Sequence, residues 1–561
     1  MGDFPVPNLL PLPVLLPLLG AALTLAFRRS DRLQRAVSIA VLGAVVVVAA
    51  VLVWQTDARG PQVLWLGAWE EPLGISLVAD RLSALMLLVS SVVTLLVLLF
   101  AIGQGHADSD DEVDRETPLS IFHPTYLVLT AGVANAFLAG DLFNLFVGFE
   151  ILLFSSYVLI TLGGAASRIH AGTTYVVVSL LSSALFLIGI AATYAATGTV
   201  NLAQLAIRIG GLDAGVALVL QLCLLTAFAI KAAVFPMSAW LPDSYPTAPA
   251  PVTAVFAGLL TKVGVYAIIR IQTLLFPESP LTGLLLWAAL LTMVIGILGA
   301  VSQSGLKRIL SFTLVSHIGY MIFGIALATQ AGTAGAIFYV VHHITIQTSL
   351  FLITGLVERI GGSTSLHRLG GLAMASPLLA TLFFVSAMNL SGIPPLSGFL
   401  AKIGLIDAGI AVGTPLAWVV VVGGIATSLL TLYALSKVWS QAFWRPLAET
   451  REVAELAAEE AADEAEQFEQ AERDAGRRAG PPPGGAATAT LVAPTGVAAA
   501  VDTSPRALPR MMLGATAAMT AVGLVITLVA GPLHAYTERA AADLQQRDPY
   551  ITSVLPEGVR R

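Results

Sequence analysis

The sequence predicts an all-α polytopic membrane protein with about 14 transmembrane helices, each near 20 residues long. Of its 561 residues, 56% are hydrophobic and only 11% are charged, and the mean hydropathy is +0.84. Apolar runs of membrane-spanning length recur along most of the chain. Its 50 glycines and 30 prolines are typical of helices that are kinked and closely packed.

Residues 1–121 are expected to hold the first three transmembrane helices, near 8–27, 34–54 and 80–103. Loop 28–35 separates the first two and carries four arginines and no lysine. Residues 60–79, with Trp65 and Trp69, are typical of a short hairpin outside the membrane, and residues 106–116 form an acidic inner loop.

Residues 122–271 are expected to form a unit of five helices. The predicted spans are 122–140, 141–162, 171–196, 213–235 and 249–271. Lys231 lies in the fourth of these apolar runs, five residues before the run breaks at Pro236. A lysine in hydrocarbon costs roughly 2.5–3.5 kcal/mol on insertion scales, so a role for it is expected.

Residues 281–440 are expected to form a second unit of five helices. The predicted spans are 281–303, 307–328, 333–357, 374–410 and 416–440. Here Lys402 lies in a run that breaks at Pro394 and Pro395. Interrupted spans that each carry a lysine are typical of a transporter with internal repeats and an ion path near the midplane of the membrane.

The two breaks also resemble each other in sequence. Pro236-Met-Ser-Ala-Trp-Leu241 and Pro395-Leu-Ser-Gly-Phe-Leu400 share the order proline, apolar, serine, small, aromatic, leucine. The broken spans are the seventh and the twelfth. A unit of five helices crosses the membrane an odd number of times, so a second copy directly after it must enter from the opposite side. We therefore predict that spans 4–8 and 9–13 are inverted repeats.

The last two parts of the chain differ in composition. Residues 441–508 combine an Ala/Glu-rich stretch with a Pro/Gly/Ala-rich linker, which is typical of a cytoplasmic charged helix and a flexible tether. A solvated charged face without a specific function is the simpler interpretation of this insert. Residues 509–561 are expected to form a last span, near 509–531, and an outer tail.

The positive charges predict the orientation. The arginines of loop 28–35 place that loop in the cytoplasm and the N-terminus outside. Parity then places Lys307 and Arg308 inside and Arg208 and Arg270 outside, so the last two depart from the rule. An even number of spans returns the C-terminus to the outside. The expected location is a bacterial cell (inner) membrane.

Ionisable side chains inside the expected spans are the parts of a proton relay. They are Glu150, Lys231, Lys262, His317, His342, His343 and Lys402. A lysine that alternates between pairing with Glu150 and standing alone could load and release a proton.

Structural interpretations of the same residues stay open. Glu150 and Lys231 could form a static pair that fixes helix packing, and Lys262 could neutralise a helix end. Adjacent positions do not share a helix face, so only one of His342 and His343 is expected to line a path, and the sequence does not select it. The breaks could be mere kinks, although backbone groups freed at membrane depth usually line a cavity.

Motifs of soluble enzymes are absent from the sequence. It contains no phosphate-binding loop, no dinucleotide-binding glycine motif and no cluster with metal-ligand spacing. Cys223 is the single cysteine, which excludes an internal disulfide and a cysteine-ligated iron–sulfur cluster. We therefore expect a transporter subunit without a cofactor, driven by an ion gradient or by a partner.

Five stretches carry a resemblance to a known family. They are Asp141 through Glu150, Lys231 through Tyr245, Ala250 through Gly264, Leu350 through Ile360, and Ser391 through Lys402. There the chain resembles the antiporter-like membrane subunits shared by respiratory complex I and the multisubunit Mrp cation/proton antiporters, and among them the Mrp D subunits. The likeness covers most of the chain and is strongest from about residue 122 to 440.

The resemblance implies that Glu150, Lys231, Lys262 and Lys402 match the family's proton-path residues. It also implies exchange of protons for sodium or a similar cation, and Mrp subunits A, B, C, E, F and G as partners. One departure is Gln347, which takes the place of a lysine that relatives carry in the eleventh span. The relay would then depend more on the neighbouring histidines.

Our hypothesis is therefore a subunit of a multisubunit monovalent cation/proton antiporter in the lipid bilayer, with no nucleic-acid partner. One alternative is a proton-pumping membrane subunit of NADH:quinone oxidoreductase or of a membrane hydrogenase. An alternative of another class is a membrane scaffold subunit that transports nothing.

Overall fold

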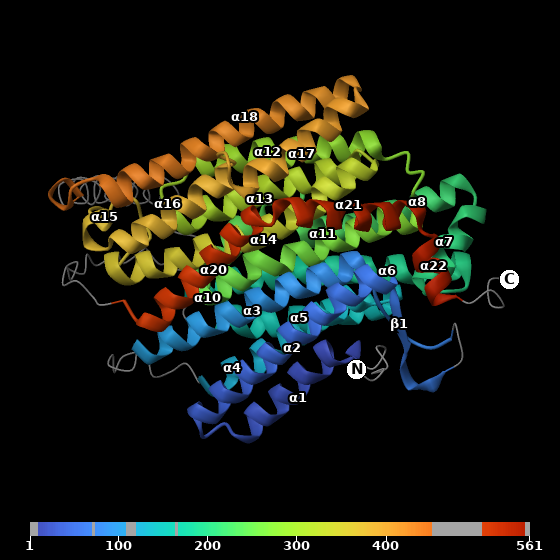
Figure 1. The fold of residues 1–561 in the computed structure, drawn as a ribbon, viewed down its shortest axis with the longest axis horizontal. Coiled ribbons are helices and arrows are strands. Elements are labelled where there is room, and N and C mark those ends of the chain that lie inside the picture. Colours follow the sequence, from blue (N-terminus) through green and yellow to red (C-terminus); the bar gives the residue numbers. More distant parts are fainter. Residues whose placement is uncertain (1–8, 70–72, 108–118, 163–165, 451–507, 556–561) are drawn as a thin grey trace, which may run out of the picture.

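The computed structural model describes residues 9–69, 73–107, 119–162, 166–450 and 508–555. Long helices packed side by side make up almost all of this structure (Figure 1). The prediction of an all-α polytopic membrane protein is confirmed. Most of the expected charged helix and linker at 441–508, from 451 to 507, and most of the acidic loop 106–116 lie outside the described residues.

The N-terminal part has three long helices and one hairpin. Its elements are α1 (Leu12–Ala26), α2 (Asp31–Arg59), β1 (Gln62–Trp65), η2 (Leu66–Ala68), β2 (Ser76–Ala79) and α3 (Arg81–Ala107). The strands are antiparallel and pair Gln62 with Ala79 and Trp65 with Ser76, so the expected hairpin is present. Gly60 ends α2 with a φ of 80°, a conformation that glycine adopts without strain.

The first predicted unit of five helices is built from more pieces than expected. They are α4 (Leu119–Leu138), α5 (Leu142–Thr161), α6 (Ala166–Thr197), α7 (Leu202–Arg208), η4 (Ile209–Gly211), α8 (Ala214–Ala232), α9 (Trp240–Ser244), η5 (Tyr245–Thr247), α10 (Ala250–Val255), η6 (Phe256–Leu260), α11 (Thr261–Arg270) and η7 (Ile271–Leu275). The expected span 213–235 ends at Ala233, which has a left-handed φ of 58°, just before Pro236. The expected span 249–271 is one helical run that contains the π-helical turn η6 and ends in the π-helical turn η7.

The second predicted unit follows its predicted spans, and one of these spans is divided at the break. Its elements are α12 (Thr282–Ser302), α13 (Leu306–Ala326), α14 (Gln330–Gly361), α15 (Leu372–Ala375), α16 (Pro377–Ser391), α17 (Ser397–Val412), α18 (Pro415–Val438) and the π-helical turn η8 (Trp439–Trp444). The expected span 374–410 consists of α16 and α17, separated at Gly392, where φ is 86°. Pro394 and Pro395 lie in this gap.

The C-terminal part departs from the prediction. After α20 (Arg510–Leu528), the expected outer tail contains two further helices, α21 (Ala530–Gln546) and α22 (Asp548–Val554). In Figure 1, α20 and α21 run across one face of the bundle, where α21 packs against α14 and α3. Tyr536, Ala540 and Leu544 form its buried stripe, one residue per turn. The hydropathy pattern did not indicate α21, because a helix with one apolar stripe has low overall hydropathy.

Each of the 14 predicted spans coincides with a helix or a run of helices. Among the described residues, 12 helices are long and apolar enough to cross a membrane, while Leu12–Ala26 and Pro377–Ser391 are shorter apolar helices. The exact number of crossings and the inversion of the repeats therefore stay predictions.

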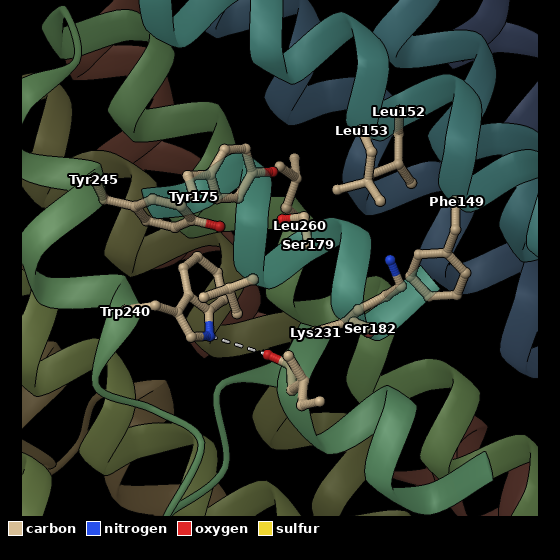
Figure 2. Close-up of a pocket in the computed structure, with 12 residues that line it drawn as sticks. Phe149, Leu152, Leu153, Tyr175, Ser179, Ser182, Lys231, Trp240, Tyr245 and Leu260 are labelled. Carbon is tan, nitrogen blue, oxygen red and sulfur yellow. Dashed lines mark hydrogen bonds between the residues drawn. The ribbon is translucent and has the colours of Figure 1, made fainter. Parts of the chain in front are cut away.

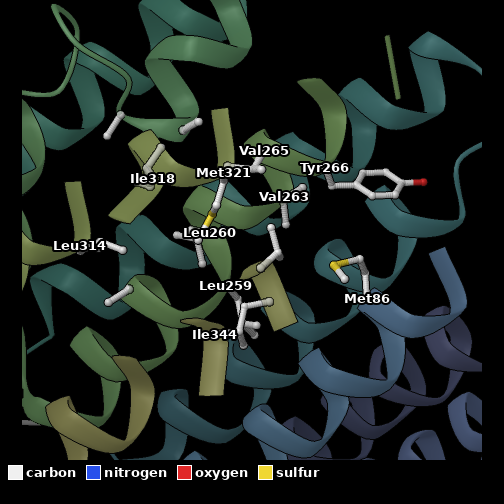
Figure 3. Packing of buried hydrophobic residues seen from close by; sticks show 14 of the residues in the cluster. Met86, Leu259, Leu260, Val263, Val265, Tyr266, Leu314, Ile318, Met321 and Ile344 are labelled. Atoms are coloured by element: carbon white, nitrogen blue, oxygen red, sulfur yellow. The ribbon is translucent and has the colours of Figure 1, made fainter. Parts of the chain in front are cut away.

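The bundle has a buried centre and an apolar exterior. Helix α14 and the run from α10 to η7 are buried along their whole apolar lengths. Side chains from α11, α13 and α14, such as Val265, Met321 and Ile344, interdigitate there (Figure 3). On the outer helices, large apolar side chains such as Val47 and Val422 are exposed, as expected for a surface that faces lipid or a neighbouring subunit.

The two predicted units share one local arrangement. The N–H of Leu142 donates to Val200 O, and the N–H of Leu202 donates to Gly140 O, which ties the start of α5 to the segment after α6. In the second unit, Leu306 N–H donates to Thr364 O and Leu366 N–H to Ser304 O. The start of α13 is thus tied to the segment after α14 in the same way, five predicted spans later.

A buried ion pair explains one exception to the positive-inside pattern. The Arg270 guanidinium donates to both carboxylate oxygens of Asp80, at 2.6 and 2.9 Å, and both residues are buried. Arg270 also donates to the Tyr266 hydroxyl and lies 5.2 Å from the ring centroid of Tyr550 on α22. Burial raises the pKa of Asp80, but the Arg270 charge outweighs it and holds that pKa below its usual value.

We expect Asp80→Asn to lower the thermal unfolding temperature of the purified complex, because an unpaired buried guanidinium costs about 3–5 kcal/mol. Asp243→Asn is the control, since its pair with Arg308 is exposed and such pairs contribute about 1 kcal/mol or less. Equal unfolding temperatures for the two variants would contradict a stabilising role of the buried pair.

Candidate functional site

Glu150 and Lys231 do not form the direct pair that their positions in the sequence allow. The Ser183 hydroxyl on α6 lies between them: it donates to Glu150 Oε1 at 2.5 Å and accepts from Lys231 Nζ at 3.1 Å. The charges are therefore joined by a short chain of hydrogen bonds in which every donor points towards the carboxylate. Lys231 is buried and Glu150 is half-buried.

A small cavity adjoins Lys231. It has a volume of about 20 Å³, enough for about one water molecule. Phe149 and the aromatic rings of Tyr175, Trp240 and Tyr245 line it together with Lys231 (Figure 2). Lys231 Nζ also lies 5.0 Å from the Phe149 ring centroid, a cation–π distance. The charge of the buried lysine is thus stabilised by a hydroxyl and an aromatic face.

Lys262 is fully buried on α11, directly after the π-helical turn η6. Its Nζ donates to the Ala257 carbonyl at 2.6 Å, within the same helical run. The wider turn frees this carbonyl from the regular helical pattern, so the helix itself supplies the partner of the lysine. Among the described residues, no carboxylate pairs with Lys262.

Aromatic and imidazole rings form a buried cluster between α13 and α14. Tyr339 Oη and His317 Nδ1 are hydrogen-bonded at 2.8 Å, and the His317 and His343 ring centroids are 5.2 Å apart. The Tyr339 ring lies 5.7 Å from His342 and 6.3 Å from His343. Both adjacent histidines therefore belong to the cluster, and the expectation that only one of them lines a path stays a prediction.

His342 extends this cluster to the break between α16 and α17. Its Nδ1 is hydrogen-bonded to Ser397 Oγ at 3.0 Å, and the Ser397 hydroxyl in turn donates to Asn389 Oδ1 at 3.2 Å. Lys402 Nζ donates to the carbonyls of Leu390 and Ser391, at 3.3 and 3.0 Å. These carbonyls end α16, so the break supplies the groups that hold the buried lysine.

The groups around the lysine differ between the two helix breaks. At the first break, Trp240 Nε1 donates to the Ile230 carbonyl, so an indole occupies a position next to Lys231. At the second, carbonyls bind Lys402 directly, and its Nζ lies 5.1 Å from the Tyr320 ring centroid. The similar sequences at Pro236 and Pro395 therefore produce related but unequal sites.

Several buried polar atoms of the cluster have no hydrogen-bond partner within the described residues. They are His342 Nε2, His343 Nδ1 and Nε2, and Gln347 Oε1. Gln347 donates from Nε2 to the Leu310 carbonyl, so its side chain is anchored to α13. Imidazole nitrogens without fixed partners can accept or release protons, which suits a relay.

The predicted site residues thus form two groups. Glu150 and Lys231 make the first, and His317, His342, His343 and Lys402 make the second. Lys262 belongs to neither group by a hydrogen bond; its helix α11 packs closely against α8, where a Cβ at Gly264 would approach Ala232 N to 2.8 Å. The gaps between the groups are not closed by a hydrogen bond in the described structure.

Sequence reasoning missed the uncharged members of the site. Ser183, Ser397, Tyr320 and Tyr339 contact the predicted residues directly, and Asn389 contacts Ser397. Tyr339 lies three and four residues before the two histidines, a helical spacing that could have indicated it. Ser183 carries no comparable signal, because hydroxyls are common in apolar helices.

Comparison with known proteins assigns the class. Residues 139–431 match the model of the family described as NADH:quinone oxidoreductase/Mrp antiporter, transmembrane. This match spans more than half of the chain and covers every residue of both groups. The chain therefore belongs to the NADH:quinone oxidoreductase/Mrp antiporter family of membrane proteins.

Two curated relatives are named as the D subunits of Na(+)/H(+) antiporters. The one from Alkalihalophilus pseudofirmus is 43% identical over 80% of this chain and 89% of its own length. The one from Bacillus subtilis is 38% identical over 79% of this chain and 88% of its own length. A chain in the Mrp complex of Dietzia sp. DQ12-45-1b has a similar structure, with a TM-score of 0.83 and 32% identity, covering 98% of this chain and 100% of that one.

We expect Gly398→Ala to destabilise the break between α16 and α17. A Cβ there would overlap the Asn389 carbonyl oxygen and come within 3.0 Å of the His342 ring, and overpacking of this kind costs about 1–3 kcal/mol. The matched control is Gly404→Ala on the same helix, where a Cβ meets nothing within 4 Å. The thermal unfolding temperature of the purified complex should be lower for Gly398→Ala than for Gly404→Ala. Equal unfolding temperatures would contradict the packing argument.

Proposed function

We propose that this chain is the D-type subunit of a multisubunit antiporter that exchanges Na⁺, or a similar monovalent cation, for protons. The observation that carries the proposal is the oriented chain from Lys231 through Ser183 to Glu150 inside an apolar bundle. The relatives named as D subunits of Na(+)/H(+) antiporters support it, because they match this chain over most of its length.

The first group can move a proton in one concerted step. Ser183 gives its hydroxyl proton to the Glu150 carboxylate while it receives one from the Lys231 ammonium. The serine is unchanged, and the ion pair becomes a neutral acid and a neutral amine. Both states are tolerable in an apolar site, since the charged one is hydrogen-bonded and the neutral one carries no buried charge.

The second group provides a continuation of the path. Lys262, held by a single carbonyl, would exchange its proton with the histidine and tyrosine cluster, and His342 and Ser397 would connect that cluster to the second break. Lys402 would take the last position, where the α16 carbonyls stabilise its ammonium form. Movements of water or side chains across the two gaps would then control passage.

The proposed setting is a bacterial cell (inner) membrane, with both termini outside and Mrp subunits A, B, C, E, F and G as partners. The likeness to a chain in an Mrp complex supports such an assembly. The exposed apolar side chains on the outer helices would face lipid or these subunits. We also propose that the units 122–271 and 281–440 are inverted repeats, and the matching backbone bonds at Gly140–Leu142 and Ser304–Leu306 support this.

Glu150→Gln is the experiment that tests the function. We expect it to abolish, or lower at least about tenfold, Na⁺-dependent proton movement in vesicles that hold the whole complex, because an amide cannot accept the serine proton. Glu358→Gln is the control, since Glu358 is an exposed carboxylate at the end of α14 that pairs with Lys307. Normal exchange by Glu150→Gln at matched expression would favour the scaffold alternative.

Ser183→Ala should lower exchange without loss of assembly, because Glu150 and Lys231 would lose the hydroxyl that joins them. Ser90→Ala provides the matched control: Ser90 is equally buried, but its hydroxyl bonds only to the Leu87 carbonyl of its own helix. Indistinguishable transport by the two variants, measured in the same vesicles, would show that the serine bridge has no role in transport.

The orientation can be tested by labelling of introduced cysteines, after replacement of Cys223. Arg29→Cys should react with a membrane-impermeant reagent only from the cytoplasmic side, and Trp69→Cys only from the opposite side. Labelling of both positions from one side would overturn the proposed orientation and the inverted repeats with it.

A further inference from the structure

A second cavity lies near the start of α5, away from the cluster of rings. It has a volume of about 670 Å³ and is lined by residues of α5, α6, α7 and the segment before β2. Its polar lining includes Asp141, Thr199, Asn201, Gln204 and Arg208. None of these residues has a role in the path described above.

Asp141 is the buried charge of this cavity. Only 5% of its surface is exposed, and its Oδ1 accepts the Asn144 N–H at 2.6 Å as the N-cap of α5. Its other carboxylate oxygen, Oδ2, has no hydrogen-bond partner within the described residues. One carboxylate oxygen is therefore used by the cap and the other is left without a partner.

Uncharged side chains that carry oxygens line the same cavity as this carboxylate. The backbone bonds from Leu142 to Val200 O and from Leu202 to Gly140 O fix the segment 200–202 beside Asp141. Directly before that segment, the Thr199 hydroxyl donates to Gln204 Oε1 on α7 at 2.6 Å, and Asn201 Oδ1 accepts the N–H groups of Ala203 and Gln204 as the N-cap of α7. A carboxylate with hydroxyl and amide oxygens is the set of ligands that hard cations prefer.

The backbone junction itself does not require a carboxylate. In the second unit the same pair of backbone bonds forms around Gly305, which takes the position that Asp141 has in the first. Asp141 also exceeds what its capping role needs, since one oxygen makes the cap and the other is left unused. A buried carboxylate oxygen without a protein partner is a position that a bound ion can satisfy.

The cavity lies at one end of the seam between α5 and α6 that leads to Glu150. On α5, Phe143 lines the cavity and Glu150 follows seven residues later on the same face. On α6, Leu187 lines the cavity and Ser183, one turn away, bonds to Glu150. One turn of a helix rises about 5.4 Å, so the cavity ends close to the serine bridge.

We propose that this cavity binds a monovalent cation of the Na⁺ type, with Asp141 Oδ2 as its charged ligand and Thr199, Asn201 and Gln204 supplying neutral oxygens. The proposal rests on the proposed antiporter function, because it gives the exchanged cation a place beside the Glu150 end of the path. Arg208 lines the same cavity but is anchored to the Thr197 carbonyl at 2.8 Å. Its charge would repel a divalent ion twice as strongly as a monovalent one.

The decisive variant is Asp141→Asn. Asparagine is as good an N-cap as aspartate, so the start of α5 is kept while the charged ligand is removed. Asp213→Asn is the matched control, because Asp213 is the N-cap of α8 by the same kind of bond but is exposed. Equilibrium binding of ²²Na⁺ to the purified whole complex should lose one equivalent in Asp141→Asn and none in Asp213→Asn.

A second variant keeps the test independent of the cap. Thr199→Val removes the hydroxyl at nearly constant shape and should weaken ²²Na⁺ binding at that site by about tenfold, the effect of one lost ligand contact. Unchanged stoichiometry in Asp141→Asn would overturn the proposal, and so would unchanged affinity in Thr199→Val. Binding of ²²Na⁺ to Glu150→Gln should stay intact. The predicted loss of transport in Glu150→Gln and the predicted loss of binding in Asp141→Asn can therefore be contradicted independently of each other.

Discussion

A charge buried among apolar helices must find its partners inside the protein, and the rest of this structure depends on that constraint. The protein meets it in three ways. Arg270 is paired with a carboxylate, Lys231 is joined to one through Ser183, and Lys402 is held by the carbonyls that end α16. Only the first of these is a fixed pair of full charges. The other two hold an ammonium group through neutral oxygens, a serine hydroxyl for Lys231 and backbone carbonyls for Lys402.

Interruptions of the helices are what make such sites possible. An unbroken helix bonds its own carbonyls and leaves none for a lysine. The break at Gly392 frees two carbonyls for Lys402, and the π-helical turn η6 frees one for Lys262. At the break after Ala232, the Ile230 carbonyl accepts a hydrogen bond from the Trp240 indole and not from a lysine. Local departures from regular helix geometry therefore supply the carbonyls that hold Lys262 and Lys402.

The candidate site was predictable where it carries formal charge. Glu150, Lys231, Lys262 and Lys402 stand out because each is isolated in an apolar run, and the prolines near two of them indicate the breaks. The connecting groups were not predictable. Ser183 is one of many hydroxyls in the spans, and its importance comes only from its position between two charges on other helices. In the same way, the sequence selected neither His342 nor His343, whereas both rings join one cluster around Tyr339.

The sequence by itself determined the class of the fold, the approximate spans, the two breaks and the charged residues. These features depend on composition and local pattern, because the thickness and low polarity of the bilayer set the length and hydropathy of each span. Only the tertiary structure decided which residues meet. It placed α21 across α14 although its hydropathy is low, it paired Asp80 with Arg270 across 190 residues of chain, and it left Asp141 with an unused oxygen beside a cavity. The physical reason is that hydrogen bonds and ion pairs act over about 3 Å between helices distant in sequence, and helix packing alone sets those distances.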